Sequence, residues 1–142
     1  AEIHPKAHEV LRQLSRDYTL LVCSDTTGET RKMVEKSGIK KYFTSEFYSN
    51  ELHLTKSKEF YELVVKSFPS SVPAQYVSIG DSIRSDILYP KSLGMKTIWV
   101  RNEALGSYDA KPDHTVDDLA EVADLLKSKS LERSTNRHFK PI

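Results

Sequence analysis

The sequence has only one cysteine, Cys23, among its 142 residues, and this excludes a disulfide framework. It also lacks an excess of charge of either sign. Its 21 basic and 20 acidic residues leave a net charge of +1, so we expect neither nucleic acid nor a membrane surface as a partner. No apolar run approaches the ~20 residues that cross a bilayer, and no signal-peptide pattern is present. We therefore expect a soluble, cytoplasmic protein with Cys23 as a core thiol.

The length fits a single domain that can bury a sizeable core. Residues 1–126 carry regular hydrophobic patterns, whereas residues 127–142 form a polar, basic tail without periodicity, which we expect to be mobile. The chain begins with Ala1 rather than methionine, which indicates a trimmed or processed start.

Short apolar runs alternate with helical periodicity along the chain. We predict strands over residues 18–23, 43–48, 75–79, 97–100 and 114–116, and helices over residues 3–14, 60–68, 83–93 and 119–126, with a short helix ending at Gly38. Strand–helix alternation with short connections predicts an α/β fold, a Rossmann-like three-layer sandwich with a parallel sheet.

Three polar clusters follow predicted strands: Ser24-Asp25, residues 49–56 and Gly80-Asp81. Ligands of parallel sheets bind beyond the carboxyl ends of the strands, so we expect these clusters to share one edge. Asp81 and Asp86, five residues apart, are hard oxygen ligands of the kind that Mg²⁺ takes. The structural alternative is that Asp81 caps the next helix and that Asp86 lies on a solvated face.

A hydroxyl, an ammonium and carboxylates in this order suit phosphoryl transfer, which depends on positioning and charge neutralisation. Ser24 would donate to a phosphoryl oxygen, and Asp81 would hold Mg²⁺. Lys56, which we expect to be exposed at the rim of the site, would neutralise the charge of the phosphoryl group. The alternative is that Ser24 is a helix cap and Lys56 a solvated lysine. If the lysine of the site is not Lys56, Lys58 is the next candidate.

These motifs resemble those of the haloacid dehalogenase-like (HAD) hydrolase superfamily over roughly residues 3–126. The apolar run ending in Ser24-Asp25 resembles motif II, residues 49–56 resemble the approach to the motif III lysine, and Gly80-Asp81 with Asp86 resembles motif IV. The resemblance implies a Mg²⁺-dependent phosphatase of a small phosphorylated molecule, acting through an aspartyl-phosphate. It assigns Ser24 and Lys56 to catalysis, these two with Asp25 to substrate binding, and Asp81 and Asp86 to the metal. Retention of Asp81 favours phosphoesters over carbon–halogen bonds.

The chain departs from the family pattern in two places. It has Lys56-Ser57 where members usually have Lys-Pro, and Tyr89-Pro90 interrupts the helix after motif IV. Because proline removes a helix hydrogen bond, we expect a kink or an early stop there.

The family's motif I, an Asp-x-Asp after the first and central strand, has no counterpart in this chain, and neither does a cap. The missing strand would lie between the strands ending at Cys23 and Ile79, and its loss would leave two rows of unpaired backbone groups. We therefore expect an amino-terminal segment or a second chain to complete the sheet.

Two alternatives remain open. Asp25-Thr26-Thr27-Gly28 resembles the Asp-Lys-Thr-Gly motif of P-type ATPases, in which case Asp25 is the nucleophile and the chain is a complete enzyme. Otherwise the chain is a non-catalytic module that binds a phosphate group or a protein partner.

Overall fold

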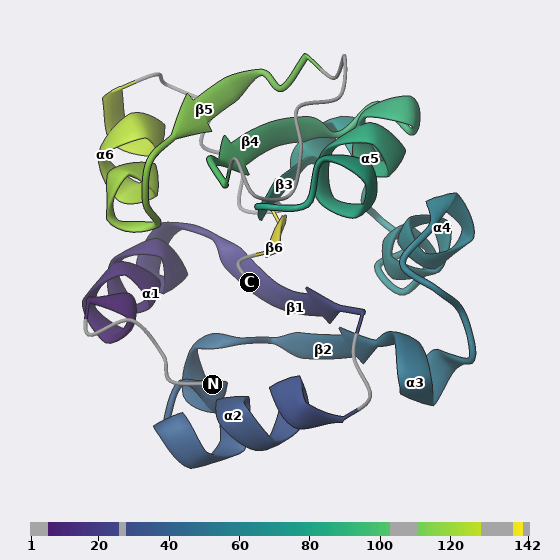
Figure 1. The fold of residues 1–142 in the computed structure, drawn as a ribbon, viewed down its shortest axis with the longest axis horizontal. Helices are drawn as coiled ribbons and strands as arrows, with labels where there is room; N and C mark the ends of the chain where they lie inside the picture. The colour runs from purple at the N-terminus through teal and green to yellow at the C-terminus, as the bar shows by residue number, and fades with distance from the viewer. Residues whose placement is uncertain (1–5, 26–27, 103–110, 129–137, 141–142) are drawn as a thin grey trace.

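Six parallel strands form one sheet in the computed structural model, which describes residues 6–25, 28–102, 111–128 and 138–140 (Figure 1). The order across the sheet is β2-β1-β6-β3-β4-β5. The strands are β1 (Thr19–Ser24), β2 (Ser45–Tyr48), β3 (Tyr76–Gly80), β4 (Lys96–Val100), β5 (His114–Val116) and β6 (His138–Lys140). The α/β fold with a parallel sheet is confirmed.

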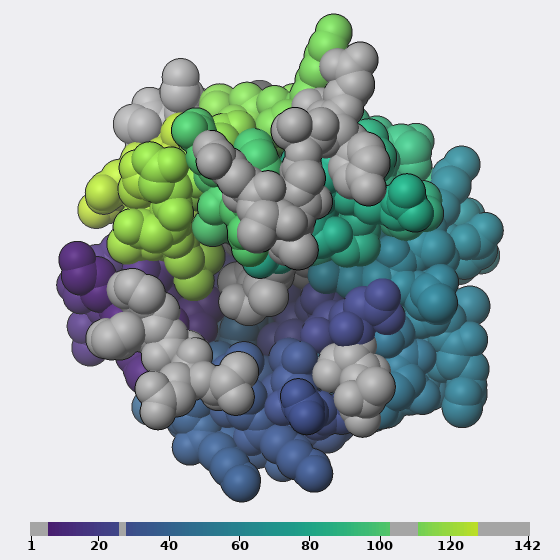
Figure 2. Space-filling model, viewed as in Figure 1, coloured from purple at the N-terminus to yellow at the C-terminus, as the bar shows by residue number. Residues whose placement is uncertain are grey.

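Helices cover both faces of this sheet, which gives the three layers. The helices are α1 (Ala7–Asp17), α2 (Glu29–Ser37), α3 (Ser49–Leu52), α4 (Lys58–Lys66), α5 (Tyr89–Ser92) and α6 (Ala120–Ser128), and the short helical turns are η1 (Lys40–Tyr42), η2 (Pro73–Gln75) and η3 (Ile83–Leu88). Figures 1 and 2 show α1 and α6 side by side on one face. None of the described helices is long and apolar enough to span a membrane.

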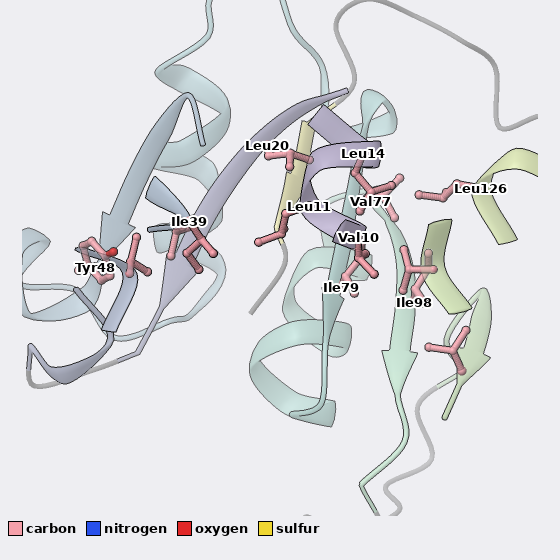
Figure 3. Packing of buried hydrophobic residues seen from close by; sticks show 14 residues of the cluster. Val10, Leu11, Leu14, Leu20, Ile39, Tyr48, Val77, Ile79, Ile98 and Leu126 are labelled. Atoms are coloured by element: carbon pink, nitrogen blue, oxygen red, sulfur yellow. The ribbon is translucent and has the colours of Figure 1, made fainter. Parts of the chain in front are cut away.

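Successive residues of β1 enter two different cores because side chains alternate across a strand. Leu20 and Val22 pack with α1, α2 and α6, a cluster that also contains residues of β3 and β4 (Figure 3). Leu21 and Cys23 pack with α4 on the opposite face. Burial on both faces explains the continuous apolar run, and it makes Cys23 a buried free thiol, as predicted.

The helix after β3 changes type before Pro90. Residues Ile83–Leu88 form a π-helical turn, and α5 begins at Tyr89 with Pro90 among its first residues. Tyr89 still donates to the Arg84 carbonyl, whereas Pro90 has no N–H, and the next carbonyl of this π-helical pattern, that of Ser85, accepts from the Tyr61 hydroxyl instead. The predicted interruption is therefore present, as a change from π to α rather than as a stop.

The most unexpected element is β6, which occupies the central position between β1 and β3. The sequence predicts a gap there and a structureless tail over residues 127–142, whereas the structure continues α6 to Ser128 and places His138–Lys140 in the gap. The physical reason is that unpaired backbone groups at the centre of a sheet are costly, so an extended segment of the same chain pairs with them. The remaining residues of the tail, 129–137 and 141–142, and residues 3–5 of the first predicted helix lie outside the described part.

Candidate active site

The carboxyl ends of β1 and β3 bring two of the predicted clusters to the same edge of the sheet. β1 ends at Ser24 and β3 ends at Gly80, directly before Asp81. Both strands run in the same direction on either side of β6. The edge predicted to carry the site therefore holds Ser24, Asp25 and Asp81, all at least partly accessible to solvent.

The third cluster reaches the site through two tight turns. His53 ends α3 in the left-handed conformation, with φ of 56°, and reverses the chain. A γ-turn then centres on Lys56, in which the Ser57 N–H donates to the Thr55 carbonyl at 2.7 Å. A proline at position 57 would have no N–H to donate in this turn. Ser57, which stands where family members usually have proline, is therefore consistent with the γ-turn.

Lys56 forms a buried ion pair with Asp86. Its Nζ contacts Asp86 Oδ1, and the two residues are only 6% and 1% exposed. The sequence predicts Lys56 at an exposed rim, and this expectation is wrong: the γ-turn directs the ammonium inward, where the buried carboxylate compensates its charge. Lys56 and Asp86, 30 positions apart in sequence, thus form an ion pair at the base of the site.

Asp86 is held in place by several further hydrogen bonds. Its Oδ2 accepts from the Ser82 N–H at 3.0 Å, and its carbonyl accepts from the buried Ser78 hydroxyl at 2.7 Å. Both carboxylate oxygens therefore have protein partners. The assignment of Asp86 as a metal ligand remains a prediction, and in this structure the residue orients Lys56 and the turn after β3.

Gly80 provides the space that Asp86 needs. A Cβ at position 80 would lie 2.6 Å from the Asp86 Cβ and would overlap its carboxylate. The Gly-Asp pair of the sequence therefore has a steric cause, because the acid five residues after Asp81 folds back onto the strand end. The backbone of Gly80 is an ordinary β conformation, so only the side chain is excluded.

Asp81 is the carboxylate best placed to bind a cation. It is half-buried, its Oδ2 lies 3.4 Å from Asn102 Nδ2, and a cavity of about 180 Å³ lies beside it, lined also by Ile79, Gly80 and Val100. In the described part of the chain, no three His, Cys, Asp or Glu side chains gather to hold a metal. Mg²⁺ usually takes one or two carboxylates with water and phosphate as its other ligands, so Asp81 fits as a partial Mg²⁺ site.

Ser24 and Asp25 complete the edge on the side of β1. The Ser24 hydroxyl donates to Thr30 Oγ1 at 3.1 Å, which ties the end of β1 to α2. Asp25 is exposed, and its charge is close enough to raise the pKa of Tyr61, although burial and the charge of Asp86 contribute more. Asp25 thus presents a carboxylate to solvent directly after β1.

Tyr61 on α4 is a residue of the site that sequence reasoning missed. It is 1% exposed, and its hydroxyl donates to the Ser85 carbonyl at 2.5 Å. Burial, followed by the nearby Asp86 carboxylate, raises its pKa well above the ordinary value of a tyrosine. Its helical spacing marks it as a core position, but nothing in the local sequence indicates a carbonyl partner after β3.

The raised pKa of Tyr61 predicts a loss of stability at alkaline pH. The unfolded chain releases the phenolic proton near pH 10, whereas the folded chain retains it, so the free energy of unfolding falls as pH rises above about 10. The Tyr61→Phe variant is expected to lose about 1 kcal/mol at pH 8, from the hydrogen bond, but to show a shallower alkaline decline. Urea unfolding between pH 8 and 11 measures both effects. An alkaline slope equal to that of the unmodified protein would refute the assignment.

Trp99 and Asn102 also contact the site, and the sequence analysis did not identify them. The Trp99 Nε1–H donates to the Asp81 carbonyl at 2.9 Å, and Asn102 lies near the Asp81 carboxylate. Trp99 belongs to β4 and Asn102 follows it, so both come from the strand next to β3. A polar residue just after a parallel strand was the available signal, because such residues share the carboxyl edge.

The chain is similar in sequence to known proteins. Residues 56–122 match the family described as HAD-hydrolase-like. The chain is 30% identical over 134 residues to pyrimidine 5′-nucleotidase PynA of Streptococcus pneumoniae, an alignment that covers 91% of this chain and 56% of the nucleotidase. The chain thus spans little more than half the length of this relative.

Solved structures show the same fold. The HAD-hydrolase YfnB of Bacillus subtilis, bound to magnesium, superposes with a TM-score of 0.79 at 21% identity, covering 87% of this chain and 55% of that one. A HAD phosphatase of Thermococcus onnurineus superposes with a TM-score of 0.75 at 22% identity, covering 93% of this chain and 60% of that one.

Proposed function

Because the chain belongs to the haloacid dehalogenase-like hydrolase superfamily, we propose that it is the Mg²⁺-binding part of a phosphatase that acts on a small phosphorylated molecule. One observation carries the proposal: the buried Lys56–Asp86 pair lies at the base of the same strand edge that presents Asp81. A fixed cation beside an accessible carboxylate suits a phosphoryl group held together with a metal.

Each residue of the site has a separate role in the proposed reaction. Lys56, held by Asp86, places a positive charge at the site without the freedom of a surface lysine, and so favours the charge that develops on a phosphoryl group. Asp81 would hold Mg²⁺, which when bound neutralises phosphoryl oxygens. The Ser24 hydroxyl, at the end of β1, would donate to a phosphoryl oxygen after leaving Thr30. An attacking aspartate that forms an aspartyl-phosphate is expected on a strand that this chain does not contain.

Mg²⁺ binding tests the proposal directly. Calorimetric titration of the purified chain with MgCl₂ and inorganic phosphate is expected to show binding that Asp81→Asn weakens at least about tenfold, because a neutral amide is a poorer ligand than a carboxylate. The matched control is Asp117→Asn, which changes an exposed aspartate whose described partner is Arg101, and it should leave the affinity unchanged. Equal affinities of the Asp81→Asn variant and the unmodified chain would eliminate the metal assignment.

Asp25 supports a second candidate, a complete enzyme, because it is exposed directly after Ser24 at the carboxyl end of β1. Hydrolysis of an aryl phosphate, with Mg²⁺ and with EDTA, separates the two. The proposal expects no turnover by this chain alone. Turnover that requires Mg²⁺ and disappears in Asp25→Asn would make Asp25 the nucleophile. Binding of a phosphate ester in stoichiometric amount, with no turnover even after the sheet is completed, would identify a non-catalytic module.

A pyrimidine 5′-nucleotide is the first phosphate ester to examine, because the relative with 30% identity is named for that substrate. Its binding is best compared with that of the free nucleoside, which lacks the phosphate. A preference for the nucleotide that requires Mg²⁺ supports a phosphate site at Asp81.

A further inference from the structure

Two carbonyl groups of the π-helical turn η3 lack the backbone donors that an α-helix would give them. In an α-helix, the Ser85 carbonyl accepts from residue 89 and the Asp86 carbonyl from residue 90. Tyr89 donates to the Arg84 carbonyl instead, which is the π-helical pattern. Residue 90 is a proline, which has no N–H and so can serve neither carbonyl. The carbonyls of Ser85 and Asp86 are therefore available to donors from other elements of the fold.

Two buried hydroxyls from other elements donate to these carbonyls. The Tyr61 hydroxyl, on α4, donates to the Ser85 carbonyl at 2.5 Å. The Ser78 hydroxyl, on β3, donates to the Asp86 carbonyl at 2.7 Å. Tyr61 and Ser78, which we call the hydroxyl pair, are each 1% exposed, so water has little access to either bond. Consecutive residues of η3 are thus tied to two different elements of the fold.

The register of η3 determines the direction of the Asp86 side chain. A π-helical turn holds one residue more than an α-helical turn, which rotates the residues before it relative to those after it by roughly 100°. In the observed register, Asp86 Oδ1 contacts Lys56 Nζ, and Asp86 Oδ2 accepts from the Ser82 N–H at 3.0 Å. A return to the α-helical pattern, with α5 in its present place, would turn the carboxylate away from Lys56.

The segments that carry Lys56 and Asp86 meet at two points. Lys56 lies shortly before α4, and Tyr61 lies near the start of that helix. Asp86 and Ser85 are neighbours in η3. The ion pair and the Tyr61 hydrogen bond therefore join the same two segments, the first through side-chain charges and the second through a backbone carbonyl. Loss of the hydrogen bond would free the turn that carries the carboxylate of the ion pair.

We propose that the hydroxyl pair sets the register of η3 and thereby positions the Asp86 carboxylate against Lys56, so that Tyr61 and Ser78 are positioning residues of the site. Pro90 makes the pair necessary, because it removes the backbone N–H that could otherwise take the place of a hydroxyl. The consequence for phosphate binding rests on the proposed function, in which Lys56 supplies the charge that meets a phosphoryl group. The positioning of Lys56 itself does not depend on that function.

The ammonium group of Lys56 reports directly on its own position. In nuclear magnetic resonance spectra of the isotope-labelled chain, a buried and ion-paired ammonium group exchanges its protons slowly with water, and the Lys56→Arg variant identifies the signal by its loss. Tyr61→Phe and Ser78→Ala are each expected to raise the exchange rate of this group about fivefold, the factor that corresponds to one hydrogen bond. The matched control is Tyr76→Phe, which removes a tyrosine hydroxyl bonded to Ser71 at the other end of β3. It should leave the Lys56 signal unchanged.

Pro90→Ala tests whether the Tyr61 hydroxyl replaces a backbone donor. Alanine at position 90 supplies an N–H that continues the π-helical pattern to the Ser85 carbonyl. Tyr61→Phe alone is expected to raise the equilibrium constant of unfolding about fivefold, but by less than about twofold when Pro90→Ala is also present. The exchange rate of the Lys56 ammonium should then return toward that of the unmodified chain. Tyr76→Phe should have the same effect on unfolding with and without Pro90→Ala.

Two results would overturn the positioning role: an unchanged Lys56 exchange rate in Tyr61→Phe and Ser78→Ala, or an equal effect of Tyr61→Phe on unfolding with and without Pro90→Ala. The first measurement requires no change at Pro90, so it decides the question without that variant. Titration with inorganic phosphate and Mg²⁺ tests the function separately, and Tyr61→Phe should bind more weakly than Tyr76→Phe. Absence of phosphate binding by every chain would contradict the proposed function, whereas the exchange and unfolding measurements would still decide the positioning.

Discussion

Replacing Lys56 with methionine is expected to lower the free energy of unfolding by about 3–5 kcal/mol, because the variant leaves the Asp86 carboxylate buried without its charged partner. Lys56 and Asp86 are 6% and 1% exposed, so water cannot replace the ammonium without opening the fold. Urea unfolding followed by circular dichroism at pH 7 measures the change.

Two controls separate this effect from the loss of a lysine in general. Lys58→Met changes an exposed lysine two residues away, at the start of α4, and is expected to alter stability by less than about 0.5 kcal/mol. The double variant Lys56→Met with Asp86→Asn removes both charges and should recover part of the loss, because the neutral amide still accepts from the Ser82 N–H. A Lys56→Met chain as stable as the unmodified protein would show that the ion pair is open to solvent.

The substitution Gly80→Ala is expected to destabilise the fold by about 1–3 kcal/mol and to weaken Mg²⁺ binding as well. The added methyl group overlaps Asp86, so the turn that carries Asp81 and Asp86 must shift away from the strand. Thermal unfolding and Mg²⁺ titration of the same preparation measure both consequences.

Gly94→Ala is the matched comparison. Gly94 has a φ of 97°, and a Cβ there would meet only the Pro73 side chain, at 3.8 Å. Its substitution costs about 1 kcal/mol through backbone conformation. It should leave Mg²⁺ affinity unchanged, because Gly94 precedes β4 at the amino end of the strands, whereas Asp81 follows the carboxyl end of β3. If Gly80→Ala retained both its stability and its affinity, Asp86 would not be packed against the strand end.

Much of the fold could be predicted because its signals are local. The apolar run that ends at Cys23 and the run that ends at Ile79 are each long enough to identify a strand buried on both faces. Gly80-Asp81 and Asp86 identified the turn that follows β3. Pro90 identified the interruption of the helix after that turn. The convergence of Ser24 and Asp81 followed from the parallel arrangement alone.

The contacts of the site could not be predicted in the same way. The inward direction of Lys56, the contact of Tyr61 with the Ser85 carbonyl and that of Trp99 with the Asp81 carbonyl each join distant positions of the chain. Local sequence patterns do not indicate contacts between positions so far apart in the chain. The residues around a lysine before a helix can be the same whether its side chain faces solvent or a buried carboxylate.

The sequence by itself determined the order of the strands from β1 to β5 and the edge that carries the polar clusters, because periodicity and residue type decide these locally. Only the tertiary structure decided that Lys56 is buried, that Asp86 has protein partners for both oxygens and that β6 pairs between β1 and β3. His138–Lys140 has no apolar pattern of its own, and it forms a strand because two distant strands present unpaired backbone groups to it.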